Sequence, residues 1–496
     1  MITSSSPDDA RVGLADQTST AIAPDPAAAG LQGRLGVPGL IAAVLAFTAP
    51  LGGVAGYVAL VIASGNGLGA PVTFLVVGLM VLVFSVGYIK MTRLVPNPGG
   101  FYSYVAAGLG REIGLGTGLL TAFGYTVGVF GFAVFGGNIA SSTVHVQFGG
   151  PEFPWWVYTF GFVLVGTTLT YRSIEASVRV MMVVMALEVG IVLVFDLAVS
   201  VRGGPTGRSL EPFALHSVTS GSVPIAALFA FLLFVGFEVT TLYREEVKDP
   251  VRTIRRSTYL SVIFIAVFYA FSAWCMITAF GVNDAVDQAQ ADPSGFFFTG
   301  VQTYLGSTML TITSLLLITS VFACLLSYGN SVCRYLYSMG KDGVLPRRLG
   351  EAHPRRHSPH RAALTLGAVS ATLTAVAALC GFPPNEVFTW ALFVAGVPLL
   401  SSYVLASASV VVYFLRKRGS ADVTRGNVVL AVAAFLALST MLVLALLNPA
   451  ALVGQESVVN SLIPIVLLAI LMLGIMYGFY LRNRKPDVYR SIGRQS

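Results

Sequence analysis

The chain has 496 residues, of which 55% are hydrophobic and only 11% are charged. Soluble domains carry about 25% charged residues, so this composition excludes a string of soluble domains and indicates a protein that crosses a membrane several times. The four cysteines, Cys275, Cys324, Cys333 and Cys380, lie in apolar runs without metal-ligand spacing. They predict neither a disulfide framework nor a zinc site, and we expect no cofactor.

Residues 1–36 are rich in Ser, Asp, Ala and Pro and precede the first apolar run. This composition is typical of a disordered segment, so we expect a cytoplasmic N-terminal tail. The segment lacks the basic start, the short apolar core and the cleavage pattern of a signal peptide. A second tail, at 482–496, is basic and is also expected in the cytoplasm.

Twelve apolar runs are long enough to cross a bilayer as helices, since a span needs roughly 17–25 residues. They lie at 38–63, 71–92, 112–142, 154–171, 178–200, 223–243, 257–280, 307–337, 362–381, 386–415, 427–447 and 458–481. The sequence therefore predicts an all-α membrane protein with twelve transmembrane helices.

Basic residues decide the orientation of these spans. If the N-terminus is cytoplasmic, only Arg202 and Arg208 of the 30 lysines and arginines fall outside. Because cytoplasmic loops collect Lys and Arg, we predict that both termini lie on the inner side of the cytoplasmic membrane. The net charge of +7 then reflects topology and contact with the lipid bilayer, and it does not indicate a nucleic-acid partner.

The first span, Val37–Ile62, carries Pro50, Gly52, Gly53 and Gly56 near its centre. Proline removes a backbone hydrogen bond and clashes with the preceding turn, and glycine weakens the helix around it. We therefore expect this helix to be interrupted. The alternative is a glycine-rich face for close helix packing.

The sixth span carries Gly236 and then Glu238 at membrane depth, before the charged run Arg244–Asp249. A lone ionisable group there costs at least ~2.5–3.5 kcal/mol and is tolerated where it faces a cavity or a partner. Glycine lets the helix open and frees main-chain groups for a ligand. We predict a second interruption that lines a binding site. The alternative is a glycine kink with Glu238 paired inside the bundle.

Spans one and six are five apart, so they cross the membrane in opposite directions. Interrupted helices at corresponding positions of two inverted halves indicate the midplane site of a secondary transporter. We therefore predict a five-plus-five inverted repeat, with halves at 37–200 and 223–415. Two additional C-terminal helices follow at 427–481.

Three motifs follow these spans in order. PNPGGFYSYV begins at Pro96, FVGFE begins at Phe234 with EEVKDP after it at Glu245, and RYLYSMGKDGVLP begins at Arg334. Together they resemble the amino acid–polyamine–organocation permease family over nearly the whole chain. The resemblance implies a LeuT-type fold, alternating access by rocking of a helix bundle, and substrate held at the breaks of spans one and six.

Two positions depart from the family pattern. Amino-acid members usually carry a Gly-Ser-Gly-like break in span one, whose backbone amides hold the substrate carboxylate. Here the region 52–56 reads GGVAG, which keeps the amides and loses the hydroxyl. Some proton-coupled members place a lysine midway along span five, where this chain has Glu188.

We expect the substrate site at the two breaks. The predicted substrate-binding residues are Thr48, Ala49, Pro50, Leu51, Gly52, Gly53, Val54, Ala55, Phe234, Val235, Gly236, Phe237 and Glu238.

Two further carboxylates, Glu188 and Asp196, lie in span five. Glu188 is eleven residues in, which places it roughly 17 Å deep at ~1.5 Å per residue. It is our candidate for carrying a coupling proton, because loss of water favours the neutral carboxyl. Binding of a substrate ammonium, or a protonated carboxyl bonded to a neighbouring helix, remains open for these residues.

Span eight offers four hydroxyls, on Thr313, Ser320, Ser327 and Ser331, for a sodium ion held against span one. Hydroxyls in membrane helices more often bond across helices or to their own backbone, so both interpretations stay open.

Each of two charged loops allows a functional interpretation and a simpler one. The charged run Arg244–Arg256, after span six, predicts salt bridges at an inner gate with Lys90, Arg93 or Arg179. The alternative is that it is a solvated helix end. The spacing of the histidines at 353, 357 and 360 suggests a metal, but a basic loop near lipid headgroups is the favoured interpretation.

A membrane enzyme needs a nucleophile, base or metal constellation near one surface, and a channel needs repeated filter loops or rings. Neither pattern is present in the sequence. We therefore predict a non-enzymatic secondary transporter of amino acids or related organic amines, coupled to H+ or Na+ or working by exchange. The alternative is a permease for polyamines or simple amines that binds a cation through Glu238 and Glu188.

Overall fold

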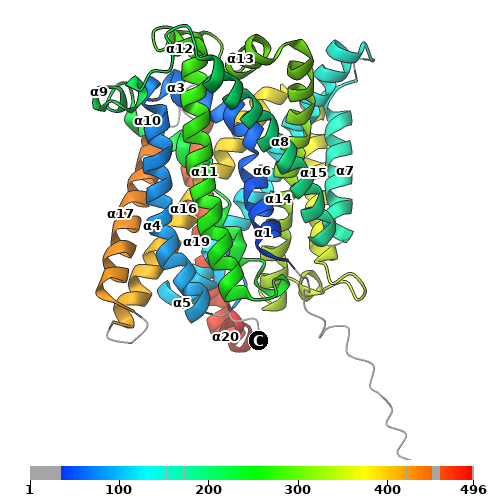
Figure 1. Ribbon diagram of the computed structural model, residues 1–496. Helices are drawn as coiled ribbons and strands as arrows, with labels where there is room; N and C mark the ends of the chain where they lie inside the picture. Colours follow the sequence, from blue (N-terminus) through cyan, green and yellow to red (C-terminus); the bar gives the residue numbers. More distant parts are fainter. Residues whose placement is uncertain are drawn as a thin grey trace, which may run out of the picture.

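The computed structural model describes residues 35–95, 97–151, 153–172, 174–418, 423–448 and 458–493. In this part of the chain the regular structure is helical, apart from one isolated bridge between Leu35 and Val247. The long helices stand side by side in one bundle, and α1 begins at the same end of the bundle as α20 (Figure 1). The tail predicted at 1–36 lies outside the described residues except for its last two.

The long helices coincide with the predicted spans. They are α4 (Ala70–Leu94), α6 (Arg111–Phe148), α7 (Trp155–Arg172), α8 (Ile174–Arg202), α11 (Pro250–Phe280), α14 (Ser307–Lys341), α15 (His360–Leu379), α16 (Pro384–Arg416), α17 (Arg425–Leu447) and α19 (Val458–Arg484). Within the described residues, eleven segments are long and apolar enough to cross a membrane, including the two interrupted ones at Val37–Ser64 and Val223–Thr241. The predicted span without such a segment is 154–171. It forms α7, where four threonines, two tyrosines and Arg172 dilute the apolar residues.

The first span is interrupted, as predicted. Helix α1 (Val37–Thr48) ends at Ala49, whose φ of 42° and ψ of 75° are left-handed. The residue before a proline is disfavoured in the α region, and Pro50 has no N–H to continue the ladder, so the backbone turns at Ala49. Helix resumes at once as α2 (Pro50–Gly52), a π-helical stretch η2 (Gly53–Val58) and α3 (Ala59–Ser64).

The sixth span is interrupted as well. Helix α10 (Val223–Leu232) ends before Gly236, whose φ is 110°. A side chain would be strained at this φ, and glycine adopts it freely. The chain continues as two 3-10 turns, η5 (Phe237–Thr241) and η6 (Arg244–Glu246), rather than as a second α-helical half.

Short helices mark the two ends of the bundle (Figure 1). One end, here called the α5/α20 end, carries α5 (Gly100–Leu109) and α20 (Pro486–Ser491). The opposite end, here called the α12/α13 end, carries α9 (Leu215–Val218), α12 (Ala285–Ala291) and α13 (Phe296–Leu305). Because spans alternate in direction, α3 and the start of α10 face the α12/α13 end.

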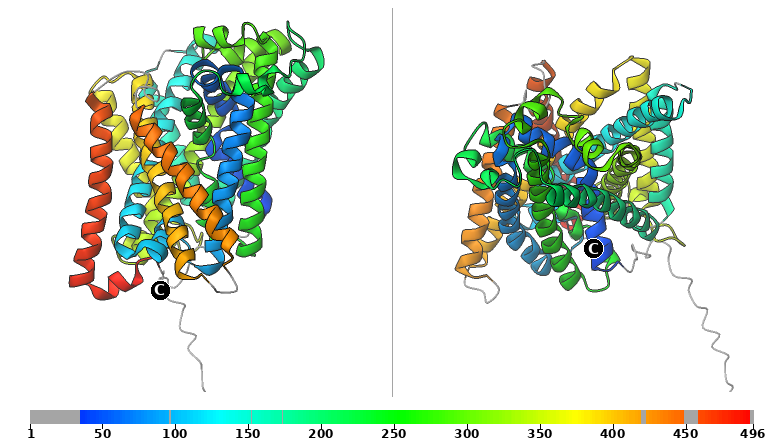
Figure 2. Two further views of the ribbon diagram at one scale, coloured as in Figure 1. Left: turned by 90° about the vertical axis from the view of Figure 1, so that its left-hand side faces the viewer. Right: turned by 45° about the horizontal axis from the view of Figure 1, so that its top comes forward.

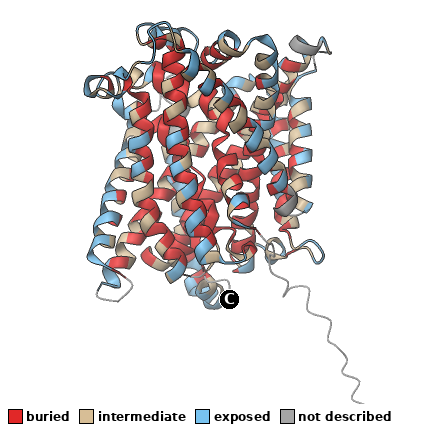
Figure 3. Cartoon of the chain, in the orientation of Figure 1, coloured by how far each residue is buried: buried red, intermediate tan, exposed pale blue. Residues whose placement is uncertain are grey.

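Burial separates the interrupted helices from the outer ones. Buried residues gather along the inner helices, and exposed residues follow the outer faces (Figure 3). In the left view of Figure 2, α19 lies at the left edge of the bundle and α17 lies on the face toward the viewer, and only 22% of the residues in the most apolar stretch of each are buried. Both breaks therefore lie inside the bundle, while α17 and α19 present most of their surface to lipid.

Candidate functional site

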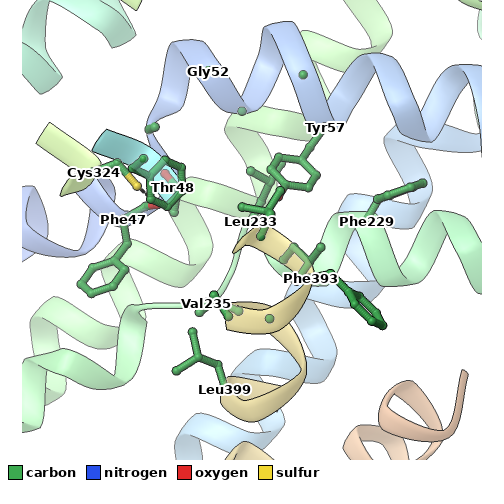
Figure 4. A pocket seen from close by; sticks show the side chains of 18 of the residues that line it. Phe47, Thr48, Gly52, Tyr57, Phe229, Leu233, Val235, Cys324, Phe393 and Leu399 are labelled. Carbon is green, nitrogen blue, oxygen red and sulfur yellow. Dashed lines mark hydrogen bonds between the residues drawn. The ribbon is translucent and has the colours of Figure 1, made fainter. Parts of the chain in front are cut away.

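A cavity of about 220 Å³ lies beside the break of the first span. The first span supplies one wall of it, including Thr48, Gly52 and Tyr57. Leu233 and Val235 of the sixth span and residues of α16 supply others (Figure 4). Helices α6, α14 and α17 also contribute, so the cavity lies where both interrupted helices meet four continuous ones.

The lining is almost entirely apolar. Its polar side chains are few, and two of them are committed to nearby carbonyls. The hydroxyl of Thr48 donates to the Leu45 carbonyl at 2.9 Å, and the thiol of Cys324 donates to the Phe47 carbonyl at 3.3 Å. The polar groups left to meet a ligand are therefore mainly main-chain groups at the break, together with the hydroxyls of Tyr57 and Tyr328.

A carboxylate from another helix supports the first break. Glu188 of α8 accepts through Oε2 from the Leu51 N–H at 3.3 Å and from the Ser320 hydroxyl of α14 at 2.6 Å. Its other oxygen, Oε1, is buried and has no hydrogen-bond partner among the described residues. Tyr269 of α11 donates to the Thr48 carbonyl at 3.1 Å. Glu188 thus caps the resumed helix from behind and does not line the cavity.

The carboxylate of the second break is fully hydrogen-bonded by groups of the protein itself. Glu238 accepts from the hydroxyls of Tyr125 (α6) and Tyr403 (α16), and also from the N–H of Gly236 at 2.9 Å. Its side chain is buried and is not part of the cavity lining. The Phe47 ring packs directly over Gly236. Glu238 therefore ties the second break to α6 and α16.

The structure brings only part of the predicted site to the cavity. Five of the predicted residues line it, namely Thr48, Ala49, Gly52, Gly53 and Val235. The others lie beside or behind the lining: Pro50, Leu51, Val54, Ala55, Phe234, Gly236, Phe237, Glu238 and the coupling candidate Glu188.

Sequence reasoning missed the phenylalanines that α6 and α16 contribute to the cavity. Phe132 and Phe135 of α6 line it together with Phe388 and Phe393 of α16, and the rings of Phe135 and Phe388 stack with centroids 4.2 Å apart. Phe132 and Phe135 are three residues apart and share a face of α6, whereas Phe388 and Phe393 are five residues apart and do not share a face of α16. In a chain with 32 phenylalanines, such spacing does not single out a binding surface from ordinary helix packing.

A buried ion pair joins α14 to η6 at the α5/α20 end. Arg334 of α14 donates to both carboxylate oxygens of Glu246, at 2.7 and 2.8 Å, and its guanidinium lies 4.1 Å from the centre of the Tyr243 ring. Of the three partners expected for the charged run, Lys90 donates to Asn427 instead. We call the Glu246–Arg334 pair the lock.

Other candidate polar groups have local partners. The hydroxyl of Ser327 donates to the Ala43 carbonyl at 2.6 Å, and Ser272 donates to the Asp196 carboxylate at 2.7 Å. The rings of His353 and His360 pack edge-on against each other, 5.2 Å apart, and against Tyr171. The histidine rings thus serve in packing, and the described residues hold no group of three ligands suited to a metal.

Comparison with known proteins gives a consistent result. The family model for amino acid permeases matches residues 50–489. The branched-chain amino acid permease BcaP of Bacillus subtilis is 25% identical over 71% of this chain and 74% of its own length. The low-affinity putrescine importer PlaP of Escherichia coli is 22% identical over 60% and 66%. The gamma-aminobutyric acid permease of B. subtilis is 24% identical over 57% and 60%. The chain therefore belongs to the amino acid permease family, whose members are membrane transporters and not enzymes.

Proposed function

We propose that this protein carries amino acids with apolar side chains across the cytoplasmic membrane, and that the cavity at the first break is its binding site. The observation that carries the proposal is the contrast within the lining. Main-chain groups at the break stand on one side, and aromatic and aliphatic side chains fill the rest. An amino acid with an apolar side chain has the same two-part chemistry.

The break suits the charged end of such a substrate. Residues Pro50–Ser64 are continuously helical, so the N–H groups of the first turn have no acceptor within their own helix. That end also carries the positive pole of the helix dipole, which favours a carboxylate. Leu51 gives its N–H to Glu188, whereas Gly52 lines the cavity. We assign the substrate carboxylate to the Gly52 amide.

The aromatic wall suits the other end. Burying a side chain of the size of leucine contributes about 1.5–3 kcal/mol, while a charge placed against an apolar wall without a partner is costly. Both charges of an amino acid lie at the end that meets the break, whereas a polyamine would place its second charge against this wall. The alternative route for it, through Glu188 and Glu238, is not supported here, because protein donors occupy three of their four carboxylate oxygens and neither residue lines the cavity. The likeness to a branched-chain amino acid permease supports the same substrate class.

The relation between the cavity and the lock supports alternating access. The lining includes Leu60 of α3, Phe229 of α10 and Ala445 near the end of α17. These residues lie on the α12/α13 side of the breaks, while the lock closes the α5/α20 end. We propose that this is the outward-facing side, with both termini cytoplasmic as the basic residues predict.

The positions of the breaks support the inverted repeat at 37–200 and 223–415, because interrupted helices in corresponding spans are its hallmark. We propose α7 as the fourth of twelve spans and α17 and α19 as the two appended helices.

Glu188 touches the first break and α14 together. We therefore propose it as the site of a coupling proton.

Uptake into proteoliposomes tests the proposal. Labelled leucine should enter saturably and be stimulated by leucine trapped inside, and valine, isoleucine and phenylalanine should compete with it. Putrescine and glutamate should not. A Gly56→Leu variant provides the matched control, because a side chain at Gly56 would project into open space at the cavity wall. If putrescine alone competed, the proposed substrate class of apolar amino acids would be refuted. If the flux did not saturate, the proposal that the protein is a carrier would be refuted.

A further inference from the structure

Two motifs that carry the family resemblance meet at the α5/α20 end, and neither lines the cavity. The first motif forms the turn before α5 and much of α5 itself. The third forms the last turns of α14 and continues through Asp342. They touch directly, because the Phe101 N–H donates to the Tyr335 hydroxyl at 3.3 Å. Tyr102 of α5 also donates to Asp342 Oδ2 at 2.7 Å.

The segment 486–493, which contains α20, is seated on the surface these motifs build. The Gly493 N–H donates to the same Asp342 Oδ2 at 2.8 Å, and the Ser491 hydroxyl donates to the Asp342 carbonyl at 2.7 Å. The side-chain amide of Asn97 donates to the Gly493 carbonyl at 2.9 Å. Asp342 is only 3% exposed. One buried carboxylate thus joins α5, α14 and this segment.

The packing is specific for this segment. Ile492 is 1% exposed, so its side chain is inserted among its neighbours. Gly493 has a φ of 70°, and a Cβ at this residue would lie 3.0 Å from the Cβ of Ala106 on α5. Tyr489 donates to Glu112 of α6 at 2.8 Å. The surface is therefore a socket shaped for a glycine preceded by a buried isoleucine.

The socket and the lock share the end of α14. Arg334 holds Glu246 of η6, and Asp342, two helical turns further on, holds α5 and the segment. Opening of the α5/α20 end requires α14 to separate from η6. We infer that the segment 486–493 is an intramolecular clasp, whose docking in the socket stabilises the closed α5/α20 end and whose release permits opening. The consequence for transport rests on the carrier proposed above.

The test uses the full chain. It combines substitutions in the segment 486–493 with a native cysteine beside the lock, whose labelling reports opening. Ser491→Ala removes the hydroxyl that bonds Asp342, and Gly493→Ala places a methyl group against Ala106. Asp487→Ala is the matched control, because that side chain is 96% exposed on the same segment. Cys333 adjoins Arg334 and is fully buried. It reports opening through its reaction with a membrane-permeant thiol reagent, followed by mass spectrometry.

We expect Ser491→Ala and Gly493→Ala to speed hydrogen exchange across 486–493 and to raise Cys333 labelling roughly tenfold, equivalent to about 1.4 kcal/mol. Asp487→Ala should leave both unchanged. Faster exchange without faster Cys333 labelling would overturn the clasp, and unchanged exchange would overturn the docking. Neither measurement uses a substrate, so a failure of amino acid uptake would count against the proposed function alone.

Discussion

The two interrupted helices expose their main chains to different degrees. In the first, the break at Ala49 is followed by glycines that line the cavity, and the supporting carboxylate, Glu188, comes from a different helix. In the second, Gly236 turns the chain, and Glu238 from the same segment bonds the Gly236 amide.

This difference implies different roles. The first break keeps main-chain groups facing an open space, so it is suited to bind a solute. The second is filled by Glu238 and by the tyrosines of α6 and α16, so it is suited to hold the wall of the cavity in place. Substitutions at the second break should therefore damage the framework, and those at the first should mainly alter binding.

Gly236→Ala should have the largest effect. A side chain at a φ of 110° is strained, at about 1–3 kcal/mol, and its Cβ would overlap the Phe47 ring. We expect loss of uptake and a lower melting temperature in detergent. Gly52→Ala is the matched control at the first break, where φ is −62° and a Cβ would lie 3.6 Å from its nearest neighbour. Equal losses of stability in the two variants would contradict the comparison.

Glu238→Gln should come next. The amide turns one acceptor into a donor, which then faces a tyrosine hydroxyl or the Gly236 N–H. A buried polar group left without its partner costs about 1–3 kcal/mol. We expect uptake to slow roughly tenfold or more at every pH, with a lower melting temperature. If Glu238 instead bound a substrate cation, the variant would keep its melting temperature and lose only affinity.

Local chemistry explains why so much of the fold was predictable. Pro50 and Gly236 act on their own backbone, so both breaks are visible in the sequence. The apolar runs predicted twelve spans, and eleven of them coincide with helical segments of the described residues that are long and apolar enough to cross a membrane. The twelfth run forms helix α7, whose threonines and tyrosines lower its mean hydropathy.

Contacts between distant residues explain what was missed. Glu238 was expected to meet substrate, but Tyr125 and Tyr403, more than a hundred residues away in the chain, occupy it. Likewise, Glu246 pairs with Arg334 of α14, which the sequence did not single out as its partner. Which of many aromatic and charged side chains meet is set by helix packing, and no local pattern records it.

Gly53→Ala should have an intermediate effect at the first break. A Cβ there would overlap the Tyr269 side chain, whose hydroxyl donates to the Thr48 carbonyl beside the break. Overpacking of this kind costs typically about 1–3 kcal/mol, and here the tyrosine can move at the expense of one hydrogen bond. We expect a severalfold loss of uptake. Gly56→Ala meets nothing within 4 Å and should transport nearly as the parent protein does, and a reversed ranking would show that Tyr269 does not support the break.

Glu188→Gln should alter coupling more than structure. Leu51 and Ser320 both donate to Oε2, so the amide keeps its oxygen there and places its NH2 where the unpartnered Oε1 lies. The variant should fold normally but carry no proton. We expect uptake that no longer depends on external pH, measured at fixed membrane potential. Uptake with the parent pH dependence would remove Glu188 from coupling.

The smallest effect is expected at the aromatic wall. Phe388 stacks on Phe135 at the cavity edge, and Phe388→Leu should enlarge the space for a substrate side chain without touching either break. Each additional buried methylene contributes about 0.8 kcal/mol, so the KM for phenylalanine should fall a few-fold relative to that for valine while the maximal rate of uptake stays near that of the parent. Leu379→Ala, on a side chain that is 88% exposed, serves as the control. A change in maximal rate with no change in relative KM would mean that Phe388 acts in gating and that the side-chain pocket lies elsewhere along the lining.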